Sequence, residues 1–407
     1  MEKPAALVME MGGMVVEVAA ISHIGSTTLV QNQDAHLELP LSDDCLLVGV
    51  FDGHSPDLGQ IAARAAKAYF ASVFRDPALL DEVLEAPEPT LRRLFRECHQ
   101  HVFTRFKAFY TNQSCTVREE RGGYLTYRTP GHSQPVRCVY GGTTATLVLL
   151  HHRRLIVANV GDSLALLAQT TISPRDLQWH AACRSAPAPA SPVDDPTTNN
   201  QSDNQADEWT PYVLLAGLHA PDCTTEFKRL EHVGLGLQCM FDHSTDPHDR
   251  VPIFKRDHVV HSHAFNPAHI NETGQVRKGP PPRGGYVKNA RNEWASVVTT
   301  PPHAAFPDTL AFTRSLGDFH MHAYGVTCEP DIVEATVEPG ATLLVATDGV
   351  WDVWQFTQVV SFLQTCGDSA TERIQRFMHE NASRANDLFG QQADNMTAVL
   401  CTFRQNH

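Results

Sequence analysis

Three apolar runs in this chain each end in an aspartate that lies beside a glycine. They are Cys45-Leu-Leu-Val-Gly-Val-Phe-Asp52-Gly53, Leu155-Ile-Val-Ala-Asn-Val-Gly161-Asp162 and Leu343-Leu-Val-Ala-Thr-Asp348-Gly349. Continuous apolar runs of this length are typical of buried strands, so each aspartate is expected at a strand end. Glycine lets the backbone turn sharply and approach a bound ion, because it has no side chain. Several such acids at one sheet edge would form a site for hard cations.

The charge balance limits the classes of partner. The 407 residues include 32 Lys and Arg against 46 Asp and Glu, which gives a formal net charge of -14. This acidity argues against duplex nucleic acid or an anionic membrane as the main partner. No apolar run approaches the roughly 18 to 20 residues needed to cross a bilayer. We therefore expect a protein that uses neither nucleic acid nor a membrane.

Two further features bear on the cellular compartment. The first 20 residues carry Glu2, Glu10 and Glu17 and have no basic start, so no signal peptide is expected. The ten cysteines lie far apart and include no Cys-x-x-Cys pair. In a chain that is not secreted they are interpreted as reduced core residues, not as a disulfide framework or a zinc module. The prediction is a cytoplasmic or nuclear protein.

Local patterns predict a succession of strands and helices. Strands are expected at residues 14–20, 44–51, 145–150, 154–158, 164–167, 332–337, 341–347 and 396–403, and helices at 90–106, 225–232, 357–364 and 370–384. Another helix is expected after Ser55 and Pro56, which suit a cap and a first turn. Strands before and after pairs of helices predict an α+β fold, in which antiparallel sheets have helices packed outside.

Two atypical stretches interrupt what we expect to be one domain over residues 14–405. Residues 185–208 consist of Ala-Pro repeats followed by Asp, Asn, Gln and Ser, a composition typical of a disordered insert. Residues 236–307 are irregular and too long for an ordinary loop. The second stretch is therefore predicted to be a lid or flap.

Three more aspartates occur in similar surroundings. Asp318 follows Thr-Arg-Ser-Leu-Gly, Asp394 precedes the last expected strand, and Asp34 lies in Asn-Gln-Asp-Ala. Carboxylates together with a backbone carbonyl suit Mg²⁺ or Mn²⁺, and the lack of paired Cys or His argues against zinc. Two such ions close together could lower the pKa of a bridging water and generate hydroxide at neutral pH. For any one aspartate, an ordinary turn after a strand remains the alternative.

The order of the motifs resembles that of the metal-dependent protein phosphatases of the PPM (PP2C-like) family. The matching sequences are Asn32-Gln-Asp-Ala35, Val50-Phe-Asp-Gly-His54, Gly141-Gly-Thr-Thr-Ala145, Ala158-Asn-Val-Gly-Asp-Ser163, Thr313-Arg-Ser-Leu-Gly-Asp318, Ala346-Thr-Asp-Gly-Val-Trp-Asp352 and Asp394-Asn-Met-Thr397. They extend over nearly the whole chain. The resemblance implies a central β-sandwich of two antiparallel sheets flanked by helices, a four-layer αββα fold, with the metal site at one end.

The resemblance also implies a set of metal ligands. Asp52 would bridge two Mg²⁺ or Mn²⁺ ions, and the carbonyl of Gly53 would bind one of them. Asp348 and Asp394 would bind the other ion. Some family members hold a weaker third ion. Here that ion would be lined by Asp162 and Asp318.

Two residues are implied in catalysis. Asp34 would orient a metal-bound water molecule. His54 would be the general acid that protonates the departing Ser or Thr oxygen, a role that suits a group titrating near neutral pH. The alternative for His54 is a turn histidine bonded to backbone. The implied activity is hydrolysis of phosphoserine and phosphothreonine in phosphoproteins, by attack of a hydroxide that bridges the two ions, and a monomer is expected.

The chain departs from the family pattern at one position that bears on activity. Family members usually carry an arginine, whose fork can hold the substrate phosphate, at the position of Leu29. An arginine from residues 277–283 could compensate. The alternative function is a catalytically weak or inactive phosphatase-like regulatory scaffold. A Ser/His/Asp hydrolase is disfavoured because the chain has no Gly-x-Ser-x-Gly motif.

Overall fold

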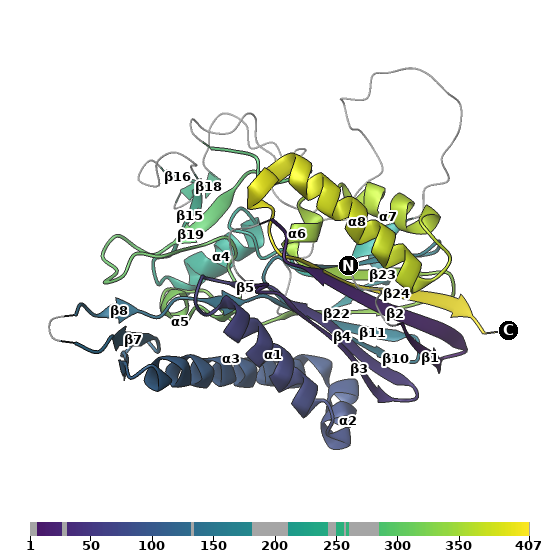
Figure 1. Cartoon of the computed structure of the whole chain (residues 1–407), viewed down its shortest axis with the longest axis horizontal. Coiled ribbons are helices and arrows are strands. Elements are labelled where there is room, and N and C mark those ends of the chain that lie inside the picture. The colour runs from purple at the N-terminus through teal and green to yellow at the C-terminus, as the bar shows by residue number, and fades with distance from the viewer. Residues whose placement is uncertain are drawn as a thin grey trace, which may run out of the picture.

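The structure, a computed structural model, describes residues 6–26, 31–131, 134–180, 211–242, 250–255, 258–259 and 285–406. Two six-stranded antiparallel sheets lie face to face, and helices cover the outer face of each (Figure 1). The α+β sandwich with four layers, helix, sheet, sheet and helix, confirms the fold class that the sequence predicts.

The first sheet, sheet A, joins strands from distant parts of the sequence. In order across the sheet, its strands are β1 (Leu7–Met11), β2 (Met14–His23), β24 (Met396–Gln405), β23 (Thr342–Ala346), β12 (Leu164–Ala168) and β14 (Tyr212–Leu214). Strand β2 pairs with β24 along its whole length, from Met14 opposite Gln405 to His23 opposite Met396. The first and last parts of the described chain therefore form neighbouring strands.

The second sheet, sheet B, contains the first of the apolar runs. In order, its strands are β13 (Gln178–Trp179), β22 (Asp331–Thr336), β11 (Arg154–Val160), β10 (Ala145–His151), β4 (Cys45–Phe51) and β3 (Ala35–Ser42). Every residue of β4 is buried. A strand in the middle of a sandwich has no solvent face, which explains why β4 is a continuous apolar run and does not alternate.

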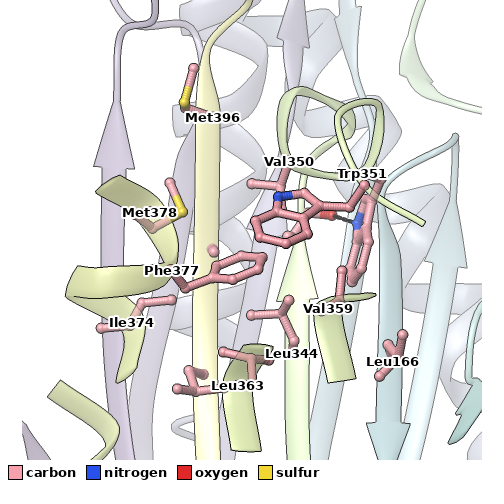
Figure 2. Packing of buried hydrophobic residues seen from close by; sticks show 14 of the residues in the cluster. Leu166, Leu344, Val350, Trp351, Val359, Leu363, Ile374, Phe377, Met378 and Met396 are labelled. Atoms are coloured by element: carbon pink, nitrogen blue, oxygen red, sulfur yellow. Dashed lines mark hydrogen bonds between the residues drawn. The ribbon is translucent and has the colours of Figure 1, made fainter. Parts of the chain in front are cut away.

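Helices pack on both outer faces of the sandwich. Sheet B is covered by α1 (Gly59–Val73), α2 (Pro77–Glu85) and α3 (Pro87–Asn112), and sheet A by α7 (Phe356–Thr365) and α8 (Ala370–Phe389) (Figure 1). Phe377 of α8 and Val359 of α7 lie in one apolar cluster with Leu344 of β23 (Figure 2). A second cluster, which includes Val48 and Val345, fills the space between the sheets. Burial of these side chains supplies most of the driving force for folding.

Shorter elements gather around one end of the sandwich (Figure 1). The short helices are α4 (Thr224–Val233), α5 (Phe319–His322) and α6 (Asp348–Trp351). One small sheet consists of β21 (Leu316–Gly317), β9 (Gly142–Thr143) and β5 (Gly53–His54), and a second of β16 (Val251–Pro252), β15 (Gln238–Phe241), β19 (Ser296–Thr299) and β20 (Thr309–Leu310). A third consists of β6 (Thr116–Glu119), β7 (Leu125–Arg128) and β8 (Arg137–Cys138), and β17 (Phe254–Lys255) pairs with β18 (His258–Val259).

Most of the expected strands and helices are found within a few residues of their predicted bounds, and four differences matter. Helix α1 begins at Gly59, because Ser55 has a φ of +92° and cannot serve as its cap. Helix α2 and the edge strands β1 and β3 were not predicted. Residues 236–307 are not wholly irregular, since β15 and β19 lie within them.

Other predictions fall outside what the structure describes or stay predictions. The insert at residues 185–208, residues 277–283 and Leu29 lie outside the described residues. The single domain over residues 14–405 stays a prediction. Among the helices that the structure describes, none is long and apolar enough to cross a membrane.

Candidate metal centre and catalytic site

Strand register brings the predicted acids together in pairs. In sheet A, Leu164 of β12 lies opposite Ala346 of β23. Asp162 lies two residues before β12, and Asp348 lies two residues after β23, where helix α6 begins. In sheet B, Ala35 lies opposite Phe51, and Asp34 and Asp52 are the residues directly beyond this pair. Each sheet therefore carries two carboxylates just beyond the ends of neighbouring strands, and the charge of Asp162 raises the pKa of Asp348 as that of Asp34 raises the pKa of Asp52.

The fifth acid, Asp394, is connected to the segment that carries Asp34 by the neighbouring residue Asn395. The side chain of Asn395, next to Asp394, accepts a hydrogen bond from the backbone N–H of Gln33 at 2.7 Å. The same side chain donates to the carbonyl of Ile24 at 2.7 Å. These contacts fix the turn before β24 against the turn before β3. The resulting acid cluster consists of Asp34, Asp52, Asp162, Asp348 and Asp394.

The acids of this cluster interact strongly with one another. Burial, followed by the charges of Asp34, Asp348 and the other two carboxylates, raises the pKa of Asp52 well above its usual value. Burial raises the pKa of Asp34 to about 7, even though Thr347 donates a hydrogen bond to it at 3.0 Å. Burial and neighbouring carboxylates also raise the pKa of Asp348 and of Asp394. A nearby divalent cation would relieve this repulsion.

The donor atoms of the acid cluster fit a hard divalent cation. One buried oxygen, Oδ1, of each of Asp34, Asp162 and Asp348 has no hydrogen-bond partner in the described part of the chain. Buried polar atoms are rarely left without a partner, so these oxygens are suited to an ion or its water ligands. Among the described residues, no three acidic, His or Cys side chains converge on one point in the way that metal ligands do.

Gly53 follows Asp52 at a point where the backbone is crowded. A Cβ atom at Gly53 would lie 2.2 Å from the carbonyl oxygen of Gly59 and 2.7 Å from that of Gln33. Thr144 holds the preceding residue, because its N–H donates to the Asp52 carbonyl at 2.8 Å and its hydroxyl accepts from the Asp52 N–H at 3.1 Å. Only glycine fits here, which explains the Asp-Gly pair without assigning the carbonyl of Gly53 to an ion.

The small sheet of β5, β9 and β21 brings His54 and Asp318 together. Gly142 of β9 lies opposite both His54 and Gly317. The Nε2 atom of His54 lies 2.8 and 2.9 Å from the two carboxylate oxygens of Asp318. A Cβ at Gly142 would lie 2.2 Å from one of those oxygens, so glycine is required for this approach. Asp318, predicted to line a third ion site with Asp162, is thus placed against His54, and an ion-binding role for it stays a prediction.

Neighbouring carboxylates influence the protonation of His54. Burial lowers the pKa of His54, but the carboxylate of Asp318, together with the charges of Asp162 and Asp308, outweighs burial and raises the pKa above its usual value. The Nδ1 atom is buried and has no hydrogen-bond partner among the described residues. His54 is therefore able to hold a proton near neutral pH with one ring nitrogen free to donate it.

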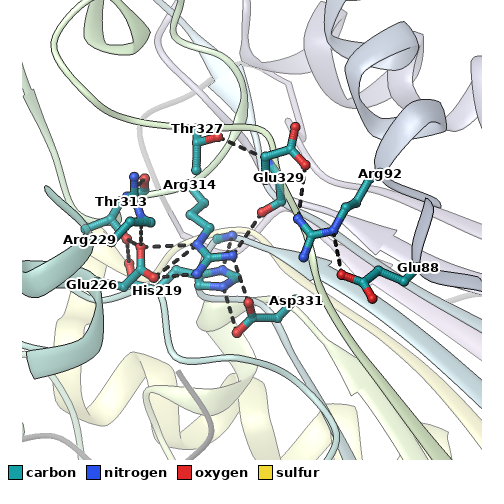
Figure 3. A network of polar contacts seen from close by, with 11 residues as sticks. Glu88, Arg92, His219, Glu226, Arg229, Thr313, Arg314, Thr327, Glu329 and Asp331 are labelled. Carbon is teal, nitrogen blue, oxygen red and sulfur yellow. Dashed lines mark hydrogen bonds and ion pairs between the residues drawn. The ribbon is translucent and has the colours of Figure 1, made fainter. Parts of the chain in front are cut away.

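A buried network of charged residues supports two of the loops that carry these side chains (Figure 3). Arg314 pairs with Glu226 and with Asp331, whose Oδ1 is 2.8 Å from Nη1 of the arginine. His219 accepts a hydrogen bond from the N–H of Gly161, next to Asp162, at 3.1 Å. The network thus anchors the strand entry before Asp318 and the turn that carries Asp162. It was not predicted, because its members are far apart in sequence.

A lysine near the acid cluster was also missed. The charges of Asp352, Asp162, Glu293 and Asp348 outweigh burial and raise the pKa of Lys288. The sequence directed attention to the arginines of residues 277–283, which lie outside the described residues. No pattern in the neighbouring sequence marks Lys288, because its position depends on contacts of the segment that carries it.

Comparison with known proteins agrees with this geometry. The family model described as Protein phosphatase 2C matches residues 94–177 and 283–387, which contain Asp162, Asp318 and Asp348. The chain belongs to the protein phosphatase 2C family. The aligned segments include neither the first motifs nor the last, so the assignments of Asp34, Asp52, His54 and Asp394 depend on the order of the motifs and on their position in the fold.

Curated relatives and one solved structure extend the match. The probable protein phosphatase 2C 38 of Oryza sativa subsp. japonica is 35% identical over 96 residues, 23% of this chain and 20% of the relative. The probable protein phosphatase 2C 72 of Arabidopsis thaliana is 34% identical over 125 residues, 30% of this chain and 37% of the relative. The chain thus spans less than two thirds of the curated relatives that it matches. A serine-threonine phosphatase 2C from Toxoplasma gondii has the same fold, with a TM-score of 0.58 at 15% identity over 99% of this chain and 100% of that one.

Proposed function

We propose that this protein phosphatase 2C family member is a metal-dependent protein serine/threonine phosphatase that hydrolyses phosphoserine and phosphothreonine in phosphoproteins. The observation that supports the proposal is the acid cluster beyond the strand ends, where the charges of Asp34, Asp348, Asp394 and Asp162 all act on Asp52 and raise its pKa. The all-oxygen donor set favours Mg²⁺ or Mn²⁺. A non-catalytic scaffold is not favoured, because the acids and His54 are all retained.

The resemblance to the family supplies the ligand set. Asp52, the Gly53 carbonyl, Asp348 and Asp394 would hold the ions. When bound, these ions would neutralise phosphate charge and lower the pKa of the attacking water. Asp34 keeps Oδ1 free to orient that water, because its Oδ2 is taken up by the hydroxyl of Thr347 at 3.0 Å.

The remaining chemistry is a proton transfer. Hydrolysis forms a bond from a water oxygen to phosphorus and breaks the bond from phosphorus to the seryl or threonyl oxygen. His54 gives its proton to that departing oxygen. Because Asp318 occupies Nε2, Nδ1 is the atom that donates, and the carboxylate stabilises the protonated ring until transfer.

The test is release of phosphate from a phosphothreonine peptide with Mn²⁺, with Mg²⁺ and with chelator. Wild type should be active only with an ion, and Asp52→Asn or Asp348→Asn should lower kcat by about 100-fold or more, since each removes charge at the reacting centre. Asp81→Asn is the matched control, because Asp81 is exposed on helix α2. A wild-type protein that releases no phosphate with any ion, or variants as active as wild type, would contradict the proposal.

A further inference from the structure

Lys288 lies on a segment that folds back over the turn carrying Asp348. In this segment, residues 285–299, the backbone N–H of Lys288 donates to the carbonyl of Glu293 at 2.7 Å. A β-bridge joins Val287 to Trp294 on either side of this bond. The lysine therefore belongs to a small closed hairpin that fixes its backbone.

The hairpin is attached to the end of helix α6. Ala290 donates its N–H to the carbonyl of Asp352 at 2.8 Å, and Gln355 donates its side-chain amide to the carbonyl of Ala290 at 2.7 Å. Asp352 lies one turn after Asp348, and its N–H donates to the carbonyl of Asp348 at 2.7 Å. The side-chain amide of Asn289, next to Lys288, also donates to the carboxylate of Asp352 at 3.3 Å. The hairpin thus holds Lys288 near the end of α6, where the charges of Asp352, Asp162 and Asp348 act on its ammonium.

Two of the four acids around Lys288 already have another cation. Arg291 lies 3.0 Å from Glu293 and 3.6 Å from Asp352. The other two acids, Asp162 and Asp348, lie just beyond the ends of β12 and β23, and the charge of Asp162 acts on Asp348. Each has an oxygen with no hydrogen-bond partner among the described residues. In the described part of the chain, no carboxylate lies within 4.0 Å of the Lys288 ammonium, although the charges of both acids raise its pKa. Its charge therefore acts on this pair from beyond direct contact.

We propose that the ammonium of Lys288 is a tethered cation that takes the place of a third divalent ion at the Asp162–Asp348 pair. The inference rests on the proposed function, because it assumes two ions at Asp52. A positive charge fixed by the hairpin lies beside the pair in every folded molecule, whereas an ion must be bound from solution. It also repels a third divalent ion at this range. The chain should therefore bind two ions per molecule and no third.

The test is a count of Mn²⁺ bound per chain, by equilibrium dialysis followed by metal analysis. Wild type is expected to bind two ions, and Lys288→Met is expected to bind one more, because the Asp162–Asp348 pair then lacks its cation. Lys67→Met is the matched control, since Lys67 is also partly buried but has Glu38 as its electrostatic partner. Lys288→Arg keeps the charge and should bind two ions.

A second variant keeps the inference testable if Lys288→Met does not fold. Asp162→Asn should leave the wild-type count at two, and in the Lys288→Met protein it should abolish the extra ion. The inference is overturned if Lys288→Met binds the same number of ions as wild type, or if Asp162→Asn alone removes an ion. A wild-type protein that binds no Mn²⁺ would instead contradict the proposed function, so the two failures are distinguishable.

Discussion

At the scale of single residues, the pairing of His54 with Asp318 determines how the site would handle a proton. Burial disfavours the charged ring, but the carboxylate, 2.8 Å from Nε2, raises the pKa of His54 above its usual value. A general acid works only while it is protonated, so activity is lost as the pH rises through this pKa. In the proposed mechanism, Asp318 would thus extend the active range toward alkaline pH as a positioning residue for His54.

Replacing Asp318 tests this role directly. Asp318→Asn should lower the pKa of His54, so the alkaline fall of kcat should move to lower pH. The loss of kcat at neutral pH should be smaller than the about 10²- to 10⁴-fold effect of a missing general acid, because the ring itself remains. The measurement is kcat against pH with Mn²⁺. Asp57→Asn, at an exposed carboxylate three residues after His54, should leave the profile unchanged, and identical profiles for both variants would refute the role.

At the scale of elements, the contact between residues 285–299 and α6 depends on one buried arginine. Arg291 donates to the carbonyls of Trp351 and Trp354, pairs with Glu293 at 3.0 Å and lies 4.8 Å from the centre of the Phe356 ring. Its surroundings leave it 5% exposed. Removal of either member of the Arg291–Glu293 ion pair would leave the other charge buried without its counter-charge.

The expected cost of breaking this contact is large. Arg291→Met should lower the free energy of unfolding by about 3–5 kcal/mol, since Glu293 stays buried without its cation. Urea unfolding in chelator measures this change. Arg376→Met is the control, because Arg376 forms an exposed pair with Glu372 and should change stability by only about 0–1 kcal/mol. Equal losses in the two variants would show that the contact does not stabilise the fold.

Elements that have a local signal were predicted, and those that depend on distant partners were not. The continuous apolar run of β4 and the helical spacing of apolar residues in α8 can be recognised from neighbouring residues alone, because burial determines which positions are apolar. Edge strand β1, Leu-Val-Met-Glu-Met, was missed, since its exposed positions, Val8 and Glu10, do not give a regular alternation of apolar and polar residues. The order of strands in each sheet and the packing of residues 285–299 on α6 arise from contacts between remote segments, which leave no local period.

The same distinction holds for the site. All five members of the acid cluster were named from the sequence, because strand ends and adjacent glycines mark three of them and the order of the motifs marks Asp34 and Asp394. The partner of His54 was not foreseen, since it depends on β9 lying between β5 and β21. Lys288 was missed for a similar reason, as its position follows from the hairpin and not from its neighbours in sequence.

At the scale of the whole molecule, the charge of the acid cluster opposes folding when no cation is bound. A carboxylate whose pKa is raised binds protons more tightly in the folded than in the unfolded state, so stability declines as the pH rises from the usual aspartate pKa toward the raised one. Histidines act in the opposite sense. Burial lowers the pKa of His36 and of His99 to about 4, so they contribute stability that is lost as the pH falls below their unfolded pKa.

A comparison of variants separates these effects. Asp52→Asn should stabilise the protein in chelator by about 0.5–2 kcal/mol, and by more at about pH 7.5 than at about pH 5, because it removes repulsion that exists only when the carboxylates are charged. Urea unfolding at both values of pH gives the difference, and the histidine contribution cancels. Asp81→Asn should show no such pH dependence. A destabilised Asp52→Asn protein would mean that the carboxylate supports the fold without an ion.

Strand register also has a consequence for how reliably the site is assembled. In β3, Ala35 and Leu37 are buried while His36 and Glu38 alternate with them, so a slip of one residue would exchange the two faces. The slipped strand would bury a histidine and a glutamate and expose the apolar pair. A slip of one residue, which would move Asp34 away from Asp52, would therefore also cost burial in the core, so the packing of β3 favours the register that brings these two acids together.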